Sequence, residues 1–224
     1  MDNILELERK LNPLGTLVLL GAGRLGGRFL SRAVQVHRGG FREILLFDGG
    51  TVEENDYFHI QLGAEPGENK ALFFEKLYSV SGYREVKGFP YNFTEEHLKV
   101  LEKAAVVVST VAGGDTLPLI KRIGQFTAEN GIPFITTNGV FGFGDEEIMI
   151  FEGIEKVTVG PALFLKEMGF PEAENVVFVG TGKLIRDGLP ITPVILDRVA
   201  DVILTVSLKK LYGRRDEGAD KSRF

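Results

Sequence analysis

Short apolar runs alternate with amphipathic segments along most of the chain. Apolar runs of four or five residues are typical of strands that are buried on both faces of a parallel sheet. A run that instead alternates apolar and polar residues is typical of a strand exposed on one face. The pattern predicts strands at 17–20, 43–47, 85–89, 105–109, 133–137 and 176–179, and an alternating strand outside the parallel series at 146–151.

Helical periodicity fills most of the intervals between these strands. The pattern predicts helices at 25–37, 69–79, 94–103, 115–130 and 193–212. Glycines follow several of them, as is common where a helix ends. Strands and helices that alternate at this spacing predict a Rossmann-like, doubly wound α/β fold with a largely parallel sheet, an extra antiparallel segment and a long C-terminal helix. We expect a single nucleotide-binding domain over residues 1–213 and a charged tail over 214–224.

A glycine-rich turn joins the first predicted strand to the first helix. It contains Gly21, Gly23 and Gly26, a spacing that permits a tight turn, close approach of a phosphate and close packing of helix on strand. The helix N-terminus behind it favours anions. Asp48 ends the second strand, where an acid takes the hydroxyls of a ribose, so NAD, ATP or a similar nucleotide without a 2′-phosphate is expected. The alternative is that the glycines serve packing alone and Asp48 is a turn residue.

A stretch of about twenty residues rich in turns follows Asp48, and loops of that length are usually functional. A nicotinamide dehydrogenase normally enters its next helix sooner. The residues from here on include Thr51-Val52, Asn55, Gln61, Gly67-x-x-Lys70-Ala71, Gly131-Ile132-Pro133 and Gly139-x-x-Gly142-Phe143-Gly144. Between Leu17 and Gly213, this order of residues resembles the family of ubiquitin-activating enzymes and their bacterial relatives in thiamin and molybdopterin synthesis, the E1-like adenylyltransferases.

The resemblance implies that the protein uses ATP to adenylate a carboxylate, with Mg²⁺ as the metal ion. It places the phosphates on the glycine turn, the ribose on Asp48, and the triphosphate near Asn55 and Lys70. The resemblance also implies that Lys70 affects the chemistry more than the folding, because a lysine at a helix start supplies charge as the α-phosphate is attacked. Further candidates for the site are Ser109 and Thr110 at the end of the fourth strand, and Asp115 as the catalytic acid that holds the metal ion.

The chain departs from the family pattern at several positions. Gly50 stands where the family has a second aspartate, and 58–60 (Phe-His-Ile) stand where it has an arginine. His59 either fills the space of that arginine or is a surface residue. Asp115 lies later than the usual metal-binding acid and could instead cap the following helix. Arg9 either reaches the phosphates across a dimer interface or belongs to a solvated helix face.

The chain of 224 residues has a net charge of −5 and no cysteine. The charge argues against nucleic-acid binding. No apolar run approaches the length of a membrane span, and the first residues lack the apolar core of a signal peptide, so we expect a cytoplasmic protein without membrane association. The missing cysteine excludes a thioester on the chain itself. The acyl group is therefore expected to pass to a separate thiol-bearing acceptor protein.

The carboxylate is expected to be a small molecule or the C-terminus of a sulfur-carrier protein, and the resemblance implies a homodimer. One branch of the family fits a short chain without cysteine: the branch that acts on guanylylpyridinol in the synthesis of the iron-guanylylpyridinol cofactor of a methanogen hydrogenase. Two other interpretations stay open. The same turn and Asp48 would serve an NAD-dependent oxidoreductase, and the missing arginine and aspartate would fit a non-catalytic nucleotide-binding homologue of the E1-like enzymes.

Overall fold

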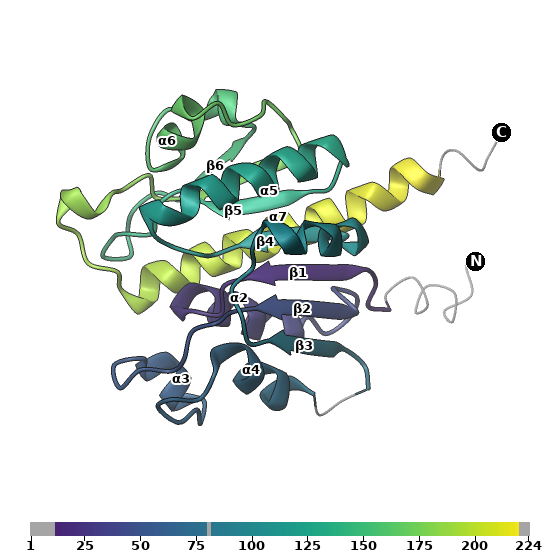
Figure 1. Cartoon of the computed structure of the whole chain (residues 1–224), viewed down its shortest axis with the longest axis vertical. Helices are drawn as coiled ribbons and strands as arrows, with labels where there is room; N and C mark the ends of the chain where they lie inside the picture. The colour runs from purple at the N-terminus through teal and green to yellow at the C-terminus, as the bar shows by residue number, and fades with distance from the viewer. Residues whose placement is uncertain (1–11, 80–81, 220–224) are drawn as a thin grey trace.

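A computed structural model describes residues 12–79 and 82–219 and shows one twisted sheet with helices on both faces (Figure 1). Within these residues seven strands pair in the order β3-β2-β1-β4-β5-β7-β6, and every pair is parallel except β6 with β7. The predicted fold class is thereby confirmed, including the antiparallel segment. The strands are β1 (Thr16–Leu20), β2 (Glu43–Phe47), β3 (Glu85–Phe89), β4 (Val106–Ser109), β5 (Phe134–Thr137), β6 (Met149–Glu152) and β7 (Val176–Gly180).

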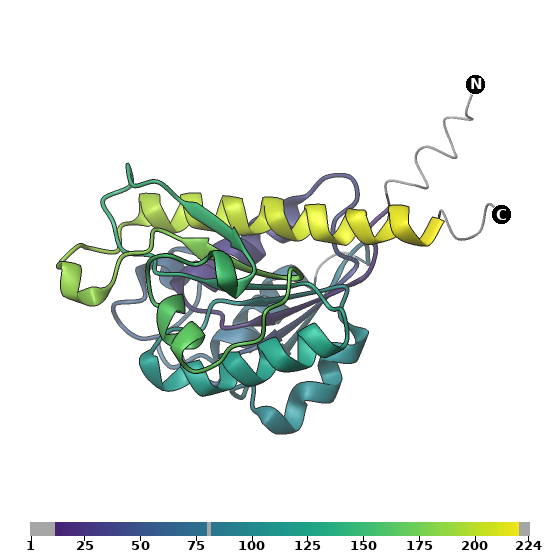
Figure 2. The ribbon, with the colours of Figure 1, turned by 90° about the horizontal axis from the view of Figure 1, so that it is seen from above.

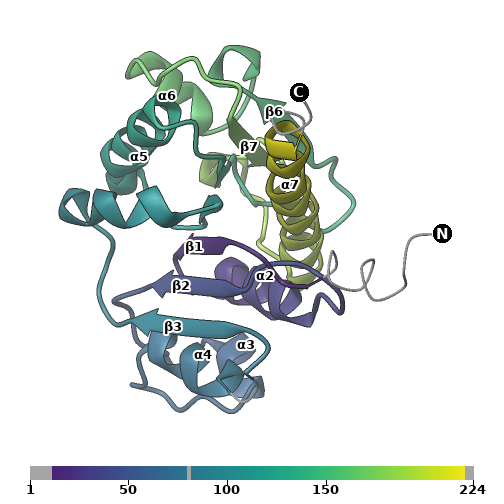
Figure 3. The ribbon, with the colours of Figure 1, turned by 90° about the vertical axis from the view of Figure 1, so that its right-hand side faces the viewer.

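The helices divide between the two faces of this sheet, as Figures 2 and 3 show for α7 and α5. One face carries α2 (Arg24–Gln35), α4 (Lys70–Tyr78) and the long α7 (Pro193–Ala219), with the short α3 (Tyr57–Gln61) beside them. The other face carries α5 (Leu117–Glu129), α6 (Ala162–Glu167) and the 3₁₀ helix η1 (Glu95–Lys103). The described residues also contain three single-turn 3₁₀ helices: η2 (Gly114–Thr116), η3 (Ile154–Lys156) and η4 (Ile185–Asp187).

Two apolar cores explain why the inner strands, such as β1, are hydrophobic on both faces. In β1, Leu17 and Leu19 face the core under α2 and α7, whereas Val18 and Leu20 face the core under α5. All four side chains are at most 1% exposed. Burial of each such side chain contributes about 1.5–3 kcal/mol, so both cores fix the strands in place.

The structure differs from the sequence prediction in several elements. The stretch after β2 contains α3, and the segment predicted as a helix at 94–103 is 3₁₀. The unassigned region between β6 and β7 contains α6. The C-terminal helix continues past Gly213 to Ala219 and so takes up part of the predicted tail. A single glycine lowers the stability of a helix by only about 1 kcal/mol relative to alanine. The four residues after Gly213, Arg-Arg-Asp-Glu, include no helix breaker. Arg9 and residues 220–224 lie outside the described residues.

The carboxyl ends of β1, β2 and β4 meet at one edge of the sheet. The chain leaves β1 toward β2 on one side, and β4 pairs with β1 on the other, so the strand order reverses between β1 and β4. Open α/β sheets bind ligands at such a reversal. The fold therefore positions the site between the glycine turn after β1 and the loops after β2 and β4.

Candidate active site

A cleft of about 690 Å³ lies at this edge of the sheet. Its walls come from the glycine turn, the loops after β2, β3 and β4, and the start of α4. The structure therefore brings most of the predicted site residues together, although they come from distant parts of the sequence. Those that line the cleft are Gly21, Gly23, Asp48, Lys70, Thr110 and Asp115.

The three glycines of the turn have different physical roles. Gly21 has φ = +94°, which side chains rarely allow. A Cβ on Gly26 would stand 2.0 Å from the carbonyl oxygen of Gly21, so this glycine permits the helix to pack on the turn. A Cβ on Gly23 would meet nothing within 4 Å. Gly23 is the N-cap of α2 and offers no side-chain cap, so the first N–H groups of the helix are available to an anion.

Asp48 joins the glycine turn to the loop that follows β2. Its two carboxylate oxygens accept hydrogen bonds from the backbone N–H of Ala22 and from that of Gly50, the latter at 2.7 Å. A carboxylate has about four acceptor positions, so two remain beside the cleft. The carboxylate is held in a fixed orientation in which it can still accept hydroxyl groups.

Lys70 owes its place in the cleft to Asn69, a residue that the sequence analysis did not assign to the site. The Asn69 amide donates to the carbonyl oxygens of Asp48 and Gly50, and its oxygen caps α4 by accepting from Leu72 N–H at 3.0 Å. The helix therefore starts at the cleft with Lys70 as its first residue. The Lys70 ammonium lies 2.8 Å from a carboxylate oxygen of Asp56.

Asp56 is the second residue that the sequence analysis missed. Its side chain is 6% exposed and lines the cleft. One oxygen accepts from Lys70 and from Glu53 N–H, and the other lies 3.4 Å from Nε of Arg24. Burial favours the protonated acid, but the hydrogen bonds from Lys70 and Glu53 outweigh it and lower the pKa of Asp56. A buried, ionised carboxylate thus connects two cations of the cleft.

Asn55 and the arginines of α2 lie around this carboxylate. Asn55 is exposed, and its side-chain and backbone oxygens lie 3.4 and 3.3 Å from Nη2 of Arg24. Arg28, one turn further along α2, points away from the cleft. Its guanidinium binds Asp197 of α7 at 3.1 Å and stacks on Phe58. Arg24 is therefore the arginine of this helix that faces the site.

His59 is fully buried, so the prediction of a surface residue is wrong. It lies behind the glycine turn, where Nε2 is 2.8 Å from the carbonyl oxygen of Ala22 and therefore donates to it. It is not among the residues that line the cleft, so within the described chain it does not fill the place of an arginine there. Burial lowers the pKa of His59, and the neutral ring supports the turn from below.

The end of β4 completes the cleft. The Thr110 hydroxyl donates to the carbonyl oxygen of Gly21 at 3.0 Å and ties β4 to the turn. The Ser109 hydroxyl is fully buried and is not among the atoms that face the cleft. Asp115 is exposed in η2, and no hydrogen bond or ion pair to another described residue engages its carboxylate. It does not cap α5, because Thr116 is the N-cap and lacks a side-chain bond to the helix.

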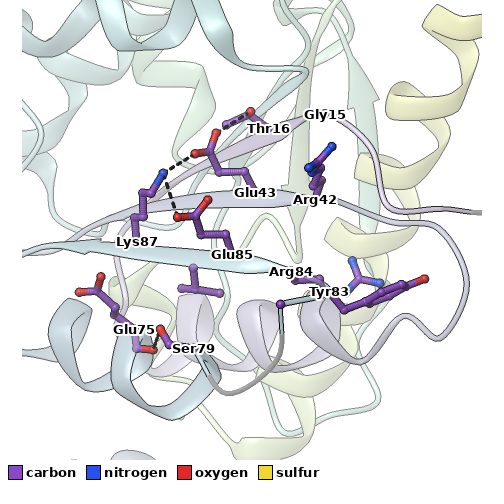
Figure 4. Close-up of a pocket in the computed structure, with 12 residues that line it drawn as sticks. Gly15, Thr16, Arg42, Glu43, Glu75, Ser79, Tyr83, Arg84, Glu85 and Lys87 are labelled. Carbon is purple, nitrogen blue, oxygen red and sulfur yellow. Dashed lines mark hydrogen bonds and ion pairs between the residues drawn. The ribbon is translucent and has the colours of Figure 1, made fainter.

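A second cavity, of about 620 Å³, lies at the opposite edge of the sheet (Figure 4). Lys87 stands between Glu43 and Glu85, at 2.8 and 3.1 Å, and Thr16 donates a further hydrogen bond to Glu43. The buried Arg84 is satisfied by backbone carbonyl oxygens. The charges that line this cavity largely neutralise one another, so it offers no concentrated charge to a ligand.

No protein-family model matches the sequence. The protein MJ0693 of Methanocaldococcus jannaschii is 39% identical over 212 residues, which is 95% of this chain and 83% of that protein. Among solved structures, HcgE from Methanothermobacter marburgensis with guanylylpyridinol and ATP bound is 40% identical, with a TM-score of 0.82 over 90% of this chain and 97% of that one. The E. coli tRNA N6-threonylcarbamoyladenosine dehydratase TcdA, solved with ATP, shares the fold at 17% identity and a TM-score of 0.74, over 96% of this chain and 91% of that one. In the described part of this chain, no helix is long and apolar enough to cross a bilayer.

Proposed function

This chain belongs to the E1-like adenylyltransferase family, and from that premise we propose that it adenylates the carboxylate of a guanylylpyridinol-type small molecule. The single observation that carries the proposal is the 40% identity, over nearly the whole of both chains, to HcgE with guanylylpyridinol and ATP bound. The cleft at the switch point of the sheet is the place where this chain would hold both substrates.

The residues of the cleft have the chemistry that ATP requires. The open N-terminus of α2 behind Gly23 and the ammonium of Lys70 suit the phosphates, and the oriented carboxylate of Asp48 suits the ribose hydroxyls. A carboxylate oxygen of the substrate would attack the α-phosphorus, and the bond from that phosphorus to the bridging oxygen would break. The products are an acyl-adenylate and pyrophosphate. Lys70 would stabilise the negative charge that develops on the phosphate oxygens.

Mg²⁺ fits the donors at the rim of this cleft. In the described part of the chain, no cluster of three or more His, Asp or Glu side chains could hold a metal ion by protein ligands alone. Mg²⁺ does not need one, because it usually binds one or two carboxylates together with substrate phosphates and water. Asp115, whose carboxylate is exposed and unengaged, would be its protein ligand and would hold the ion against the triphosphate.

The acceptor of the acyl group must be another molecule, because the chain has no cysteine on which to form a thioester. We propose a separate protein that carries the thiol. The C-terminus of a sulfur-carrier protein is the second candidate for the carboxylate. A homodimer, as the family resemblance implies, is also part of this proposal.

Pyrophosphate exchange tests the proposal. The purified protein is incubated with ATP, labelled pyrophosphate and one candidate carboxylate at a time. We expect exchange with guanylylpyridinol and none with guanylylpyridinol amide, which lacks the nucleophilic oxygen. Exchange should persist after treatment with a thiol-alkylating reagent, because the chain has no thiol to modify. ATP binding without exchange for any carboxylate would contradict adenylation and favour a non-catalytic nucleotide-binding protein.

A further inference from the structure

The cations that face the cleft are few. The E1-like pattern has an arginine shortly after its asparagine, and this chain has Phe58, His59 and Ile60 in that region. Within the described chain, none of these three side chains lines the cleft. Phe58 lies under Arg28, and His59 lies behind the glycine turn. Among the residues that the structure describes, the cations that do line it are Arg24 and Lys70.

Arg24 is directed toward this space by the loop after β2. It is the first residue of α2 and follows Gly23, so its backbone stands at the open helix N-terminus. Its side chain turns toward Asp56 and Asn55, at 3.3–3.4 Å, and is half exposed, at 52%. A guanidinium in this position stands beside the N–H groups that would receive a phosphate.

We infer that Arg24 is the phosphate-binding arginine of this site, in place of the one missing from the loop after β2, and that Asp56 is the residue that positions it together with Lys70. The inference deepens the proposed function and rests on it. Arg24, on the glycine turn, would contact the triphosphate, and Asp56 would hold Arg24 and Lys70 in position beside it.

An acid beside a triphosphate needs a physical reason. Asp56 is only 6% exposed, against 14% for Lys70 and 52% for Arg24, so the carboxylate lies deeper than the two cations. A phosphate that enters the cleft meets the cations first, and the three charges together leave a net charge of +1. Free arginine and lysine side chains lose rotamer entropy when they become fixed. Asp56 fixes both before the nucleotide arrives.

Calorimetry separates a triphosphate contact from a general effect of charge. ATP and AMP are titrated into the wild type and into Arg24→Gln, without any carboxylate. We expect Arg24→Gln to weaken ATP binding about tenfold, as for the loss of one hydrogen bond to a charged group, and to leave AMP binding within about twofold. The matched control is Arg32→Gln, which removes the same charge from the same helix. Arg32 pairs with Asp197 and Asp201 and does not line the cleft.

Equal ATP affinities in Arg24→Gln and Arg32→Gln would overturn the assignment of Arg24. Equal losses for ATP and AMP in Arg24→Gln would overturn it too, because a contact to the β- or γ-phosphate is absent with AMP. These binding measurements need no turnover. A wild type that binds ATP but exchanges no pyrophosphate would therefore contradict the proposed function, while the ATP and AMP affinities would still test the assignment of Arg24. A wild type that does not bind ATP would overturn both.

Asp56 is tested by kinetics. Asp56→Asn keeps the shape of the side chain and removes its charge. If Asp56 positions the cations, Asp56→Asn lowers the maximal rate of pyrophosphate exchange about tenfold, because the phosphates are no longer aligned. The KM for ATP does not rise, because the substitution also removes a negative charge near the phosphates. The Arg24→Gln substitution should then cost less in the Asp56→Asn background than in the wild type. Unchanged exchange per folded protein, or independent effects in the double variant, would show that Asp56 is structural alone.

Discussion

Lys70→Met offers a test of the most buried ion pair in the cleft. The family resemblance implies that Lys70 matters more for the chemistry than for folding. In the structure, however, its ammonium lies 2.8 Å from Asp56, and the two side chains are 14% and 6% exposed. The substitution removes the charge, keeps most of the aliphatic chain, and leaves Asp56 ionised in a buried place. We therefore expect a loss of stability as well as a loss of rate.

The size of the loss follows from what Asp56 keeps. Removal of one partner from a fully buried pair costs about 3–5 kcal/mol. Asp56 still accepts from Glu53 N–H at 3.2 Å and still faces Arg24 at 3.4 Å, a longer and more exposed contact. We expect about 2 kcal/mol, which for a chain of this length lowers the melting temperature by about 4–8 °C. Pyrophosphate exchange per folded site should fall about 10²–10³-fold.

The assay is thermal unfolding followed by circular dichroism, together with exchange corrected for the folded fraction. Lys76→Met on the same helix is the matched control, because Lys76 is 82% exposed and lies 3.9 Å from Glu68. It should melt like the wild type, since exposed pairs contribute little. Asp56→Asn combined with Lys70→Met should recover much of the stability, because no buried charge remains unpaired, but should not recover exchange. Equal melting temperatures for Lys70→Met and Lys76→Met would refute the reasoning.

Three further predictions concern the glycine turn and its supports. Asp48→Ala should weaken ATP binding by about 2–3 kcal/mol in calorimetry, since it removes a charged acceptor, and unchanged affinity in the folded variant would contradict the ribose assignment. Gly26→Ala should lower the melting temperature and abolish ATP binding, because its Cβ would stand 2.0 Å from the Gly21 carbonyl oxygen, whereas Gly23→Ala should fold normally. Burial lowers the pKa of His59, so its ring is neutral in the folded protein. Its contribution to stability is therefore complete above the ordinary pKa of 6.5 and declines as the pH falls from 6.5 toward the pKa of the folded state. Thermal unfolding between pH 8 and 5 should show this decline in the wild type and a flatter profile in His59→Gln, whose amide can still donate to Ala22; parallel profiles would contradict it.

The sheet and the glycine turn could be predicted because their signals are local. The inner strands of the parallel series, such as β1, β4 and β7, are largely apolar runs. The spacing of Gly21, Gly23 and Gly26 lies within six residues. Asp48 is found by its place at the end of a strand. Each of these features depends on neighbours in the sequence, and the structure brings Gly21, Gly23 and Asp48 together at the cleft.

The supports of the site could not be predicted, because they join residues that are distant in sequence. His59 donates to Ala22, 37 residues away, and Asp56 faces Arg24, 32 residues away. In the sequence, an acid and a histidine in a polar loop resemble solvated surface residues. Only the return of the loop to the turn buries them. The same holds for α6, whose six residues are too few to establish a period.

The loop between β2 and α4 accounts for the difference between this cleft and a general dinucleotide site. A glycine turn with an acid at the end of the second strand would serve an NAD-dependent enzyme equally well, since it needs only to hold a pyrophosphate and a ribose. Adenylation also needs fixed positive charge at the phosphates, because charge shifts onto the leaving pyrophosphate. Three contacts of the loop hold this positive charge in place. Asn69 starts α4 so that Lys70 stands at the cleft, and Asp56 binds both Lys70 and Arg24. His59 supports the glycine turn from below. A long polar loop that is anchored so thoroughly is better explained by the needs of a triphosphate than by those of a hydride carrier.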